Sequence, residues 1–401
     1  MVGGRQVGLG VIGLGRAFTL MLPTFGRDKR FRLVAATSPG AEARTAFTAE
    51  FAAPTFDDVE TLCRDPGVEA VYIASPHQFH AEHVAIAARA GKHILVEKPL
   101  AITLDEGKAM VVAAREAGVH MVVGPSHGFD APVLRAREII AGGEVGRLRM
   151  INAMNYTDFL YRPRRPEELD SAQGGGVVFS QAVHQIDVAR LLGGGMVRTV
   201  RAMTGNWDPA RPTEGAYSLI MDFEGGAFAS LTYSGYGRFD SDEFMGWMGE
   251  LGRRKDPADY GRARRALKAA TSAKDEAAMK RRRNYGQDGA GLSTDSPLPE
   301  AHEHFGFVMA CCERADLRPT PDGVMIYGDE EARLDPLPRP KIPRVEVMDE
   351  LYAAVVDNVP PLHSGPWGLA TLEVSLAILQ SAQEGREIAM NLQVPAKQTP
   401  D

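Results

Sequence analysis

A lysine near the end of a short apolar run is well placed for acid–base chemistry. The run His93-Ile94-Leu95-Val96 is β-prone and leads directly into Glu97-Lys98-Pro99. An ammonium group there can hold a hydroxyl oxygen, or accept its proton once a neighbouring cation lowers the pKa of the lysine. An ordinary surface Glu-Lys pair in a turn would read the same way, so the surrounding elements must decide.

Strands and helices alternate without interruption around this lysine. We expect strands over residues 7–12, 31–37, 70–75, 93–96 and 120–123, and helices after residue 16 and over 41–51, 59–64, 81–90 and 104–117. This alternation predicts a doubly wound parallel sheet of the α/β class, in which ligands bind at the carboxyl ends of the strands. Lys98 then lies at the ligand-binding edge.

A glycine motif follows the first expected strand. A Gly-x-Gly-x-x-Gly pattern exists at Gly8, Gly10 and Gly13, but that frame would place the turn inside the strand, where glycine only weakens pairing. In the more useful frame Gly13 makes the tight turn, and Gly15 lets the backbone approach a pyrophosphate at the start of the next helix. The third position is then Phe18, whose bulk should push the helix away from the strand. A purely structural turn is nearly as consistent with this motif.

The end of the second strand bears on the choice between NAD and NADP. An acidic residue is expected there when the ribose 2′-hydroxyl is bound in the NAD manner. The chain instead reads Ala36-Thr37-Ser38-Pro39, with Arg44 nearby. No carboxylate repels a 2′-phosphate, so NADP is not excluded.

Length and composition indicate a two-domain globular protein. With 401 residues the chain exceeds the size of a typical single core. We expect a dinucleotide-binding domain over residues 1–127 and an α+β domain with a large mixed sheet over 128–401, with strands at 148–154, 199–203, 217–223 and 227–233 and closing helices at 345–358 and 369–384.

Charge and cysteine content exclude several classes of protein. The net charge of −7 argues against general affinity for nucleic acid or an anionic membrane. Three cysteines are too few for a disulfide scaffold or a zinc site. No segment approaches the length of a membrane span, and we expect a cytoplasmic enzyme. The basic stretch at about 250–285 holds 12 Lys/Arg against 4 Asp/Glu between 253 and 283, which favours a helical insertion with a solvated face over a nucleic-acid arm.

Four motifs in order resemble the Gfo/Idh/MocA oxidoreductase family. They are Gly13-x-Gly15, Ser75-Pro76-His77-x-x-His80, Gly91-Lys92-His93 leading to Glu97-Lys98-Pro99, and Gly174-Gly175-Gly176 leading to His184-x-x-Asp187. The resemblance covers nearly the whole chain. It implies a Rossmann domain that binds NAD, or NADP, and an open-faced second domain that carries substrate and builds homodimers or homotetramers through its sheet.

The resemblance also implies roles for individual residues. Lys98 and His184 would act together on the reacting carbinol, with Ser180 where the family often has an aspartate that relays protons. Ser180 and His184 would share an α-helical face at i and i+4. His127 would replace an arginine frequent in the family. The implied cofactor-binding residues are Gly13, Gly15, Arg16, Ala17, Phe18, Ser38, Ser75, Pro76, His77, His80, Glu97, Lys98 and His127.

Two stretches, 124–130 and 161–166, are similar to dehydrogenases that oxidise the cis-4,5-dihydrodiol of phthalate to a catechol. Such a small dianionic substrate needs fixed cations, and the resemblance places Tyr156, Arg162, Arg164, Arg165 and His184 around it. Arginine binds carboxylates in a two-pronged manner, although a solvated basic loop would read the same way. The alternatives are a sugar or polyol dehydrogenase and, less consistent with Lys98 and His184, a non-catalytic ligand sensor.

We expect no metal site. His77, His80 and His83 follow one another at three-residue steps, but this segment offers no further zinc ligands. Packing of the following helix explains His80 and His83 better.

Overall fold

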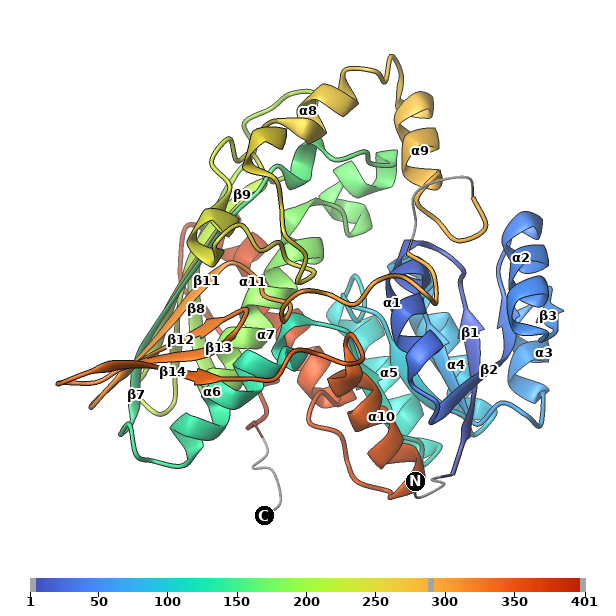
Figure 1. Cartoon of the computed structure of the whole chain (residues 1–401), viewed down its shortest axis with the longest axis horizontal. Helices are drawn as coiled ribbons and strands as arrows, with labels where there is room; N and C mark the ends of the chain where they lie inside the picture. Colours follow the sequence, from blue (N-terminus) through green and yellow to red (C-terminus); the bar gives the residue numbers. More distant parts are fainter. Residues whose placement is uncertain (1–4, 288–291, 397–401) are drawn as a thin grey trace. The chain divides into compact units, whose positions relative to one another are not determined.

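A computed structural model describes residues 5–287 and 292–396. They form two compact units, each described by itself (Figure 1). The first unit comprises residues 1–125, 278–298 and 341–369, and the second comprises 126–277, 299–340 and 370–401. Both units are therefore built from separate stretches of chain, in contrast to the single boundary expected at residue 127.

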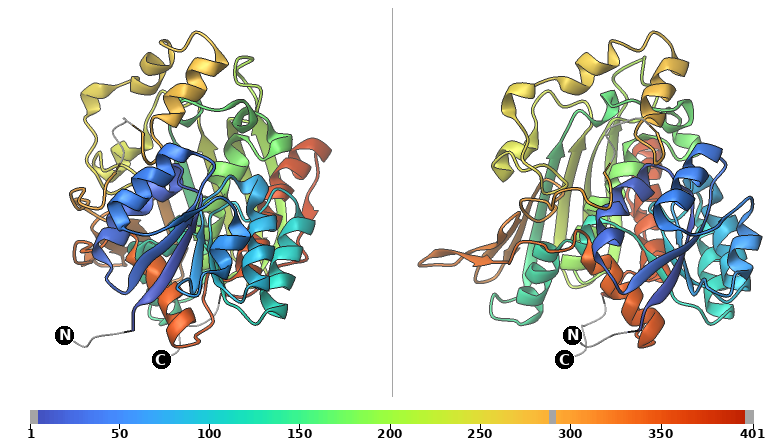
Figure 2. Two further views of the ribbon diagram at one scale, coloured as in Figure 1. Left: turned by 90° about the vertical axis from the view of Figure 1, so that its right-hand side faces the viewer. Right: turned by 45° about the vertical axis from the view of Figure 1, so that its right-hand side comes forward.

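The first unit contains a parallel sheet of six strands in the order β3-β2-β1-β4-β5-β6. The strands are β1 (Val7–Ile12), β2 (Phe31–Thr37), β3 (Thr55–Phe56), β4 (Ala70–Ile73), β5 (His93–Val96) and β6 (Met121–Val123). Side chains of β1, β4 and β6 are buried throughout, as expected for a sheet covered on both faces. This confirms the doubly wound α/β fold, and Figure 2 shows helices on both sides of the sheet.

Local sequence explains where the helices of this sheet begin and end. The helices are α1 (Arg16–Arg27), α2 (Ala41–Phe51), α3 (Val59–Arg64), α4 (His80–Arg89) and α5 (Leu104–Glu116). Asp58 caps α3, and Thr103 with Glu106 forms a capping box on α5. Gly91 and Gly118 adopt the left-handed φ values of 69° and 65° that end α4 and α5.

Two later stretches of chain complete the first unit. In the stretch 341–369, α10 (Val345–Val356) contributes Tyr352, whose ring packs edge-on against Phe31 of β2 at 5.9 Å. Thr24 of α1 donates a hydrogen bond to the carbonyl of Pro343 at 2.7 Å. In the stretch 278–298, the carbonyl of Thr294 accepts from Arg27 at 2.9 Å. The first unit thus requires residues from the last third of the sequence.

The second unit is built on a nine-stranded mixed sheet in the order β14-β13-β12-β11-β7-β10-β9-β8-β15. Its strands are β7 (Leu148–Tyr156), β8 (Val197–Gly205), β9 (Ala216–Phe223), β10 (Phe228–Ser234), β11 (Phe307–Cys312), β12 (Asp316–Thr320), β13 (Gly323–Tyr327), β14 (Ala332–Pro336) and β15 (Ile388–Ala389). Within this order β7 and β10 run parallel, and the other paired strands run antiparallel. The expected large mixed sheet is confirmed.

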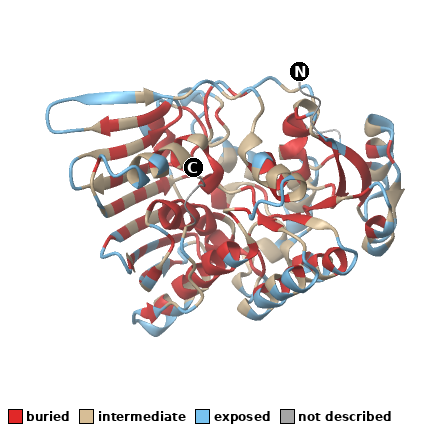
Figure 3. Ribbon diagram, turned by 90° about the horizontal axis from the view of Figure 1, so that it is seen from below, coloured by how far each residue is buried: buried red, intermediate tan, exposed pale blue. Residues whose placement is uncertain are grey.

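One face of this sheet is covered and the other is exposed. Helix α6 (Ala131–Ala141) packs on β12 and β13, and α7 (Val183–Leu192) packs on β10. Buried and exposed residues alternate along β8, β9 and β10, as Figure 3 shows by colour. Ile220, Met203 and Phe228 are exposed on these strands. Oligomerisation through this sheet stays a prediction.

The basic insertion is helical, as expected. It contains α8 (Arg262–Leu267) and α9 (Ala273–Arg281). Outside the insertion, the last helix of the described chain is α11 (Gly365–Glu384). The guanidinium of Arg264 lies 4.0 Å from the ring centre of Tyr161, and Glu276 accepts a hydrogen bond from Arg211 at 2.6 Å. Among the described residues, no helix has the length and apolar character needed to cross a lipid bilayer.

Candidate active site

The turn between β1 and α1 has the geometry that a dinucleotide requires. Gly13 adopts φ +100°, and a Cβ there would lie 2.7 Å from the amide nitrogen of Ser75. Gly15 precedes α1 without a side-chain cap, and a Cβ there would meet nothing within 4 Å. The open space beside an uncapped helix N-terminus fits a pyrophosphate group. Gly13 therefore lies in the turn before α1, as the frame beginning there requires, whereas Gly8 and Gly10 lie inside β1.

Phe18 has a packing role that sequence reasoning missed. Its ring is fully buried and contacts Phe25, Phe47 and Phe51 of α1 and α2, with centroids 6.0 to 6.5 Å away. Tyr285 completes the cluster at 5.0 Å. The bulky residue at the third position of the motif thus packs in an aromatic cluster between α1 and α2.

Arginines lie in the first turns of α1 and α2. Burial, together with the charges of Arg283 and Arg344, lowers the pKa of Arg16 to about 10. Arg44 donates to the carbonyl of Ser38 at 2.6 Å and forms an ion pair with Asp57 at 3.2 Å, so its charge is partly compensated. Ala17 is the second residue of α1 and half-buried.

Glu97 anchors the turn that carries Lys98. Its carboxylate is buried and accepts a hydrogen bond from the hydroxyl of Tyr72 at 2.6 Å. Burial raises the pKa of Glu97, although Lys98 and the Tyr72 hydroxyl partly oppose the shift. The glutamate of the Glu-Lys-Pro motif therefore ties the turn that carries Lys98 to Tyr72 of β4.

His80 joins two loops at the same sheet edge. Its Nδ1 lies 3.1 Å from the carbonyl oxygen of Pro99, and its Nε2 lies 3.1 Å from that of Ser75. Burial lowers the pKa of His80 to about 4, so at neutral pH the ring is neutral and its single N–H donates to a carbonyl on one side only. His83 contacts the Ser75 hydroxyl through Nδ1 at 2.9 Å. His80 and His83 therefore both contact Ser75 and hold the loop 75–77, which contains Pro76 and His77.

In the second unit, the backbone fixes the orientation of His184. The ring is buried on α7, and its Nδ1 accepts a hydrogen bond from the amide of His127 at 3.4 Å. Phe305 packs against both histidine rings, with centroids 4.8 and 4.9 Å away. A neutral imidazole has a single N–H, so an acceptor role for Nδ1 favours the tautomer with the proton on Nε2. His184 can then donate a hydrogen bond to a substrate oxygen.

A partly buried hydrogen bond holds the loop that supplies this amide. The Ser126 hydroxyl donates to the carboxylate of Asp187, one turn beyond His184 on α7, and accepts from the Gly128 amide at 3.3 Å. The last residue of the His184-x-x-Asp187 motif therefore acts through the loop that carries His127. Sequence reasoning noted the motif but not this role.

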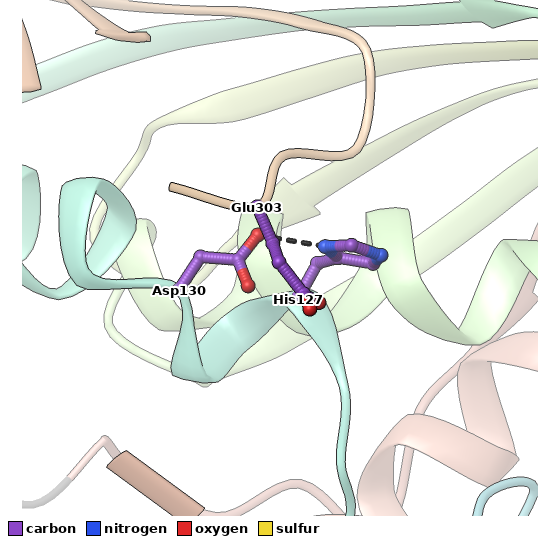
Figure 4. Close-up of side chains that lie close together, drawn as sticks. All are labelled: His127, Asp130 and Glu303. Carbon is purple, nitrogen blue, oxygen red and sulfur yellow. Dashed lines mark hydrogen bonds and ion pairs between the residues drawn. The ribbon is translucent and has the colours of Figure 1, made fainter. Parts of the chain in front are cut away.

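His127 belongs to a buried acid–base cluster with Asp130 and Glu303 (Figure 4). Its Nδ1 lies 2.7 Å from a carboxylate oxygen of Asp130. Burial alone would lower the pKa of His127, but the Asp130 carboxylate outweighs it and raises the pKa. One donor atom from each of the three residues lies within 4.8 Å of the others, the spacing of a possible cation site, where sequence reasoning expected no metal. The direct hydrogen bond between His127 and Asp130 accounts for the short distance between these two residues.

The helix around Ser180 differs from the expected α-helical geometry. Residues Val178–Ala182 form a π-helical turn, and α7 begins only at Val183. The Ser180 hydroxyl donates to the carbonyl of Gly176. The regular α-helical geometry assumed for Ser180 is therefore absent, while a shared face of Ser180 and His184 stays a prediction.

The three candidate substrate arginines have different partners. Arg162 pairs with Asp158 at 3.2 Å and feels the charge of Glu250, and Arg165 pairs with Glu167 at 3.1 Å. Arg164 instead stacks on the ring of Phe159 at 3.5 Å and donates to that residue's carbonyl, while its Nε is buried without a partner. Burial lowers the pKa of Arg164 to about 10. Arg164 thus has the least compensated charge of the three.

Tyr233 links these arginines to the surroundings of His184. Its hydroxyl lies 2.9 Å from that of Thr157 and 3.2 Å from Oε1 of Gln181, and its ring stacks on Phe305 at 6.1 Å. Burial and the charge of Glu250 raise the pKa of Tyr233. The charges of Arg162 and Arg164 oppose this rise, so both arginines lie nearby. Tyr156 ends β7, and its ring packs on Phe239 at 6.1 Å. Tyr233 continues the alternating buried positions Ala229 and Leu231 of β10, a pattern that indicates burial but not its polar partners.

The histidine at position 80 predicts a pH dependence of stability. Its pKa in the folded state, about 4, lies below the unfolded value near 6.5, so its contribution is fully present above pH 6.5 and is lost as pH falls toward 4. Below pH 6.5 the free energy of unfolding of the native protein should fall by up to about 3 kcal/mol because of His80, and His80→Gln should remove this part of the fall. Urea unfolding of both proteins between pH 7 and 4.5 measures it. A difference between them that does not change with pH would contradict the assignment.

Known proteins resemble the chain over nearly its full length. Residues 7–125 match the family described as oxidoreductase family, NAD-binding Rossmann fold, and residues 133–253 match the GFO/IDH/MocA C-terminal domain. The 1-carboxy-3-chloro-3,4-dihydroxycyclohexa-1,5-diene dehydrogenase of Comamonas testosteroni is 46% identical over 94% of each chain. The 1,5-anhydro-D-fructose reductase of Ensifer adhaerens is 40% identical over 48% of this chain and 55% of that protein.

A solved structure supports the same assignment. The structure of a protein from Bordetella bronchiseptica RB50 is 43% identical, has a TM-score of 0.90, and is matched over 96% of this chain and 100% of that one. The two family matches lie on the parallel sheet and on the start of the mixed sheet described above. The chain therefore belongs to the Gfo/Idh/MocA family and is an oxidoreductase with an NAD-binding Rossmann domain.

Proposed function

We propose that the protein is an NAD-dependent dehydrogenase of a carboxylated cis-dihydrodiol, which it oxidises to the corresponding catechol. The observation that carries the proposal is the 46% identity, over 94% of both chains, with a dehydrogenase of a carboxylated dihydroxycyclohexadiene. The narrower proposal is phthalate 4,5-cis-dihydrodiol, whose product is 4,5-dihydroxyphthalate.

The arginine loop supports a substrate that carries carboxylates. Arg164 is a cation with a buried, unpartnered Nε, beside Arg162. A carboxylate would supply the missing acceptor, and a charge-assisted hydrogen bond contributes roughly 1.5 to 3 kcal/mol. A neutral sugar or inositol would not supply a charged acceptor for this nitrogen. The second carboxylate of a phthalate diol distinguishes it from the substrate named for the Comamonas relative.

Lys98 and His184 are the proposed groups that manage the hydroxyl proton. Because the His127 amide favours a proton on Nε2 of His184, this histidine donates a hydrogen bond that orients the carbinol oxygen. Lys98 then accepts the hydroxyl proton as the general base. Bound NAD supplies the hydride acceptor. The C–H and O–H bonds of one carbinol break, a ketone forms, and enolisation of the ketone completes the aromatic ring.

A substrate panel tests the proposed function. We expect reduction of NAD by the purified protein with a carboxylated cis-dihydrodiol and little reduction with sugars or inositols, measured by absorbance at the nicotinamide band with NAD and NADP in parallel. The panel should contain diols with two, one and no carboxylates. Activity on sugars alone would favour the sugar or polyol alternative, which the partial likeness to a fructose-derivative reductase supports.

The roles of the two proton-handling residues predict distinct mutant behaviour. We expect Lys98→Ala and His184→Ala to lower kcat at least ~100-fold while NADH affinity, measured by fluorescence, is largely kept. His184→Gln should recover part of the rate because its amide can still donate a hydrogen bond. Lys108→Ala, on the exposed face of α5, is the charge control. A His184→Gln variant as slow as His184→Ala would show that the histidine is the base.

Arg164, the least compensated of the three arginines, is expected to affect substrate binding. We expect Arg164→Ala to raise KM for the carboxylated diol at least ~10-fold, as for a lost charge-assisted bond, with a smaller effect on a diol without carboxylates. Arg198→Ala removes an equally charged but exposed residue of β8 and should leave both KM values unchanged. Equal effects of Arg164→Ala on both diols would argue against carboxylate binding by this residue.

A further inference from the structure

A late segment of the chain lies against the cofactor side of the Rossmann sheet. We call it the returning segment, residues 278–287 and 292–298, which belong to the first unit although they follow the basic insertion. Figure 1 shows its last residues, in orange, running alongside α1. The guanidinium of Arg27 on α1 donates to the carbonyls of Thr294 and Ser296 at 2.9 and 2.6 Å. Gly26 leaves no room for a side chain, since a Cβ would lie 2.6 Å from the Thr294 oxygen.

Tyr285 fixes the first half of the returning segment. Its ring is buried against Phe18, the third residue of α1, and its hydroxyl donates to Glu50 of α2 at 2.6 Å. Phe18 follows the phosphate-binding turn directly. Tyr285 therefore sets the segment beside the N-terminal turn of α1.

The next two residues reach the start of α2. Gly286 adopts φ +72°, and a Cβ there would lie 2.9 Å from the Cα of Ala43, so the backbones approach closely. Gln287 donates to Glu42 at 2.7 Å. Since α2 begins just after the end of β2, the segment borders the position expected for the adenosine ribose.

Arg283 lies two residues before Tyr285 in the returning segment. It is exposed, and its charge acts on Arg16, the first residue of α1. Arg344 adds a third positive charge. Like charges gathered at a helix N-terminus repel one another and the helix dipole, and a polyanion reverses that cost. Gly15, with open space where its side chain would be, lies next to Arg16.

We propose that Arg283 of the returning segment binds the pyrophosphate of the dinucleotide together with Arg16 and the N-terminus of α1. A residue encoded far beyond the Rossmann sheet thus completes the cofactor site. This assignment does not depend on the identity of the substrate.

Equilibrium binding of NADH and NADPH to the full-length protein, followed by fluorescence, tests the proposal. We expect Arg283→Ala to weaken both by a similar factor, about 5- to 10-fold, because the pyrophosphate is common to the two. The dependence of affinity on salt should also become shallower, since one charge contact is lost. Arg283→Lys should retain part of the affinity.

Arg282→Ala is the matched control, because it removes an exposed charge one residue away and should bind both cofactors normally. The melting temperatures of the cofactor-free variants check that the fold is intact. Unchanged affinity of Arg283→Ala for both dinucleotides would overturn the proposal. A loss confined to NADPH would also overturn it, since it would place the guanidinium at the 2′-phosphate.

Discussion

The close approach of Gly13 to the end of β4 is the constraint on which the cofactor site depends. Any side chain at this position would collide with the backbone of Ala74 and Ser75. With only hydrogen there, the chain can leave β1, turn at once and begin α1 at Arg16. The helix N-terminus then faces the point where strand order reverses, between β1 and β4, which is where open α/β sheets bind ligands. The loops held by His80 lie at the same edge.

The two units treat their buried polar groups in different ways. In the first, His80 is neutral and its ring lies between the backbone carbonyls of Pro99 and Ser75. In the second, the Asp130 carboxylate raises the pKa of His127, and the His127 amide orients His184. Burial disfavours charge in both cases, and the carboxylate beside His127 reverses the outcome. The same type of side chain therefore contacts backbone carbonyls in one unit and a carboxylate in the other.

Much of the fold could be predicted from the sequence because local signals agree there with tertiary structure. Apolar runs ending in glycine or proline marked β1, β2, β4 and β5, and Gly91 and Gly118 marked helix ends. The site was less predictable. The motifs pointed to Lys98 and His184, but the packing of Tyr285 on Phe18 and the hydrogen bond from Ser126 to Asp187 join residues distant in sequence. Periodicity carries no information about such partners.

The discontinuous first unit has a consequence for biosynthesis. Phe18, Thr24 and Phe31 have partners at Tyr285, Pro343 and Tyr352, more than 250 residues downstream. While the ribosome is still translating the mixed sheet, the nascent parallel sheet exposes the apolar surfaces that these residues later cover. Its final packing must await the emergence of α10, so chaperone protection during synthesis would matter most over that interval.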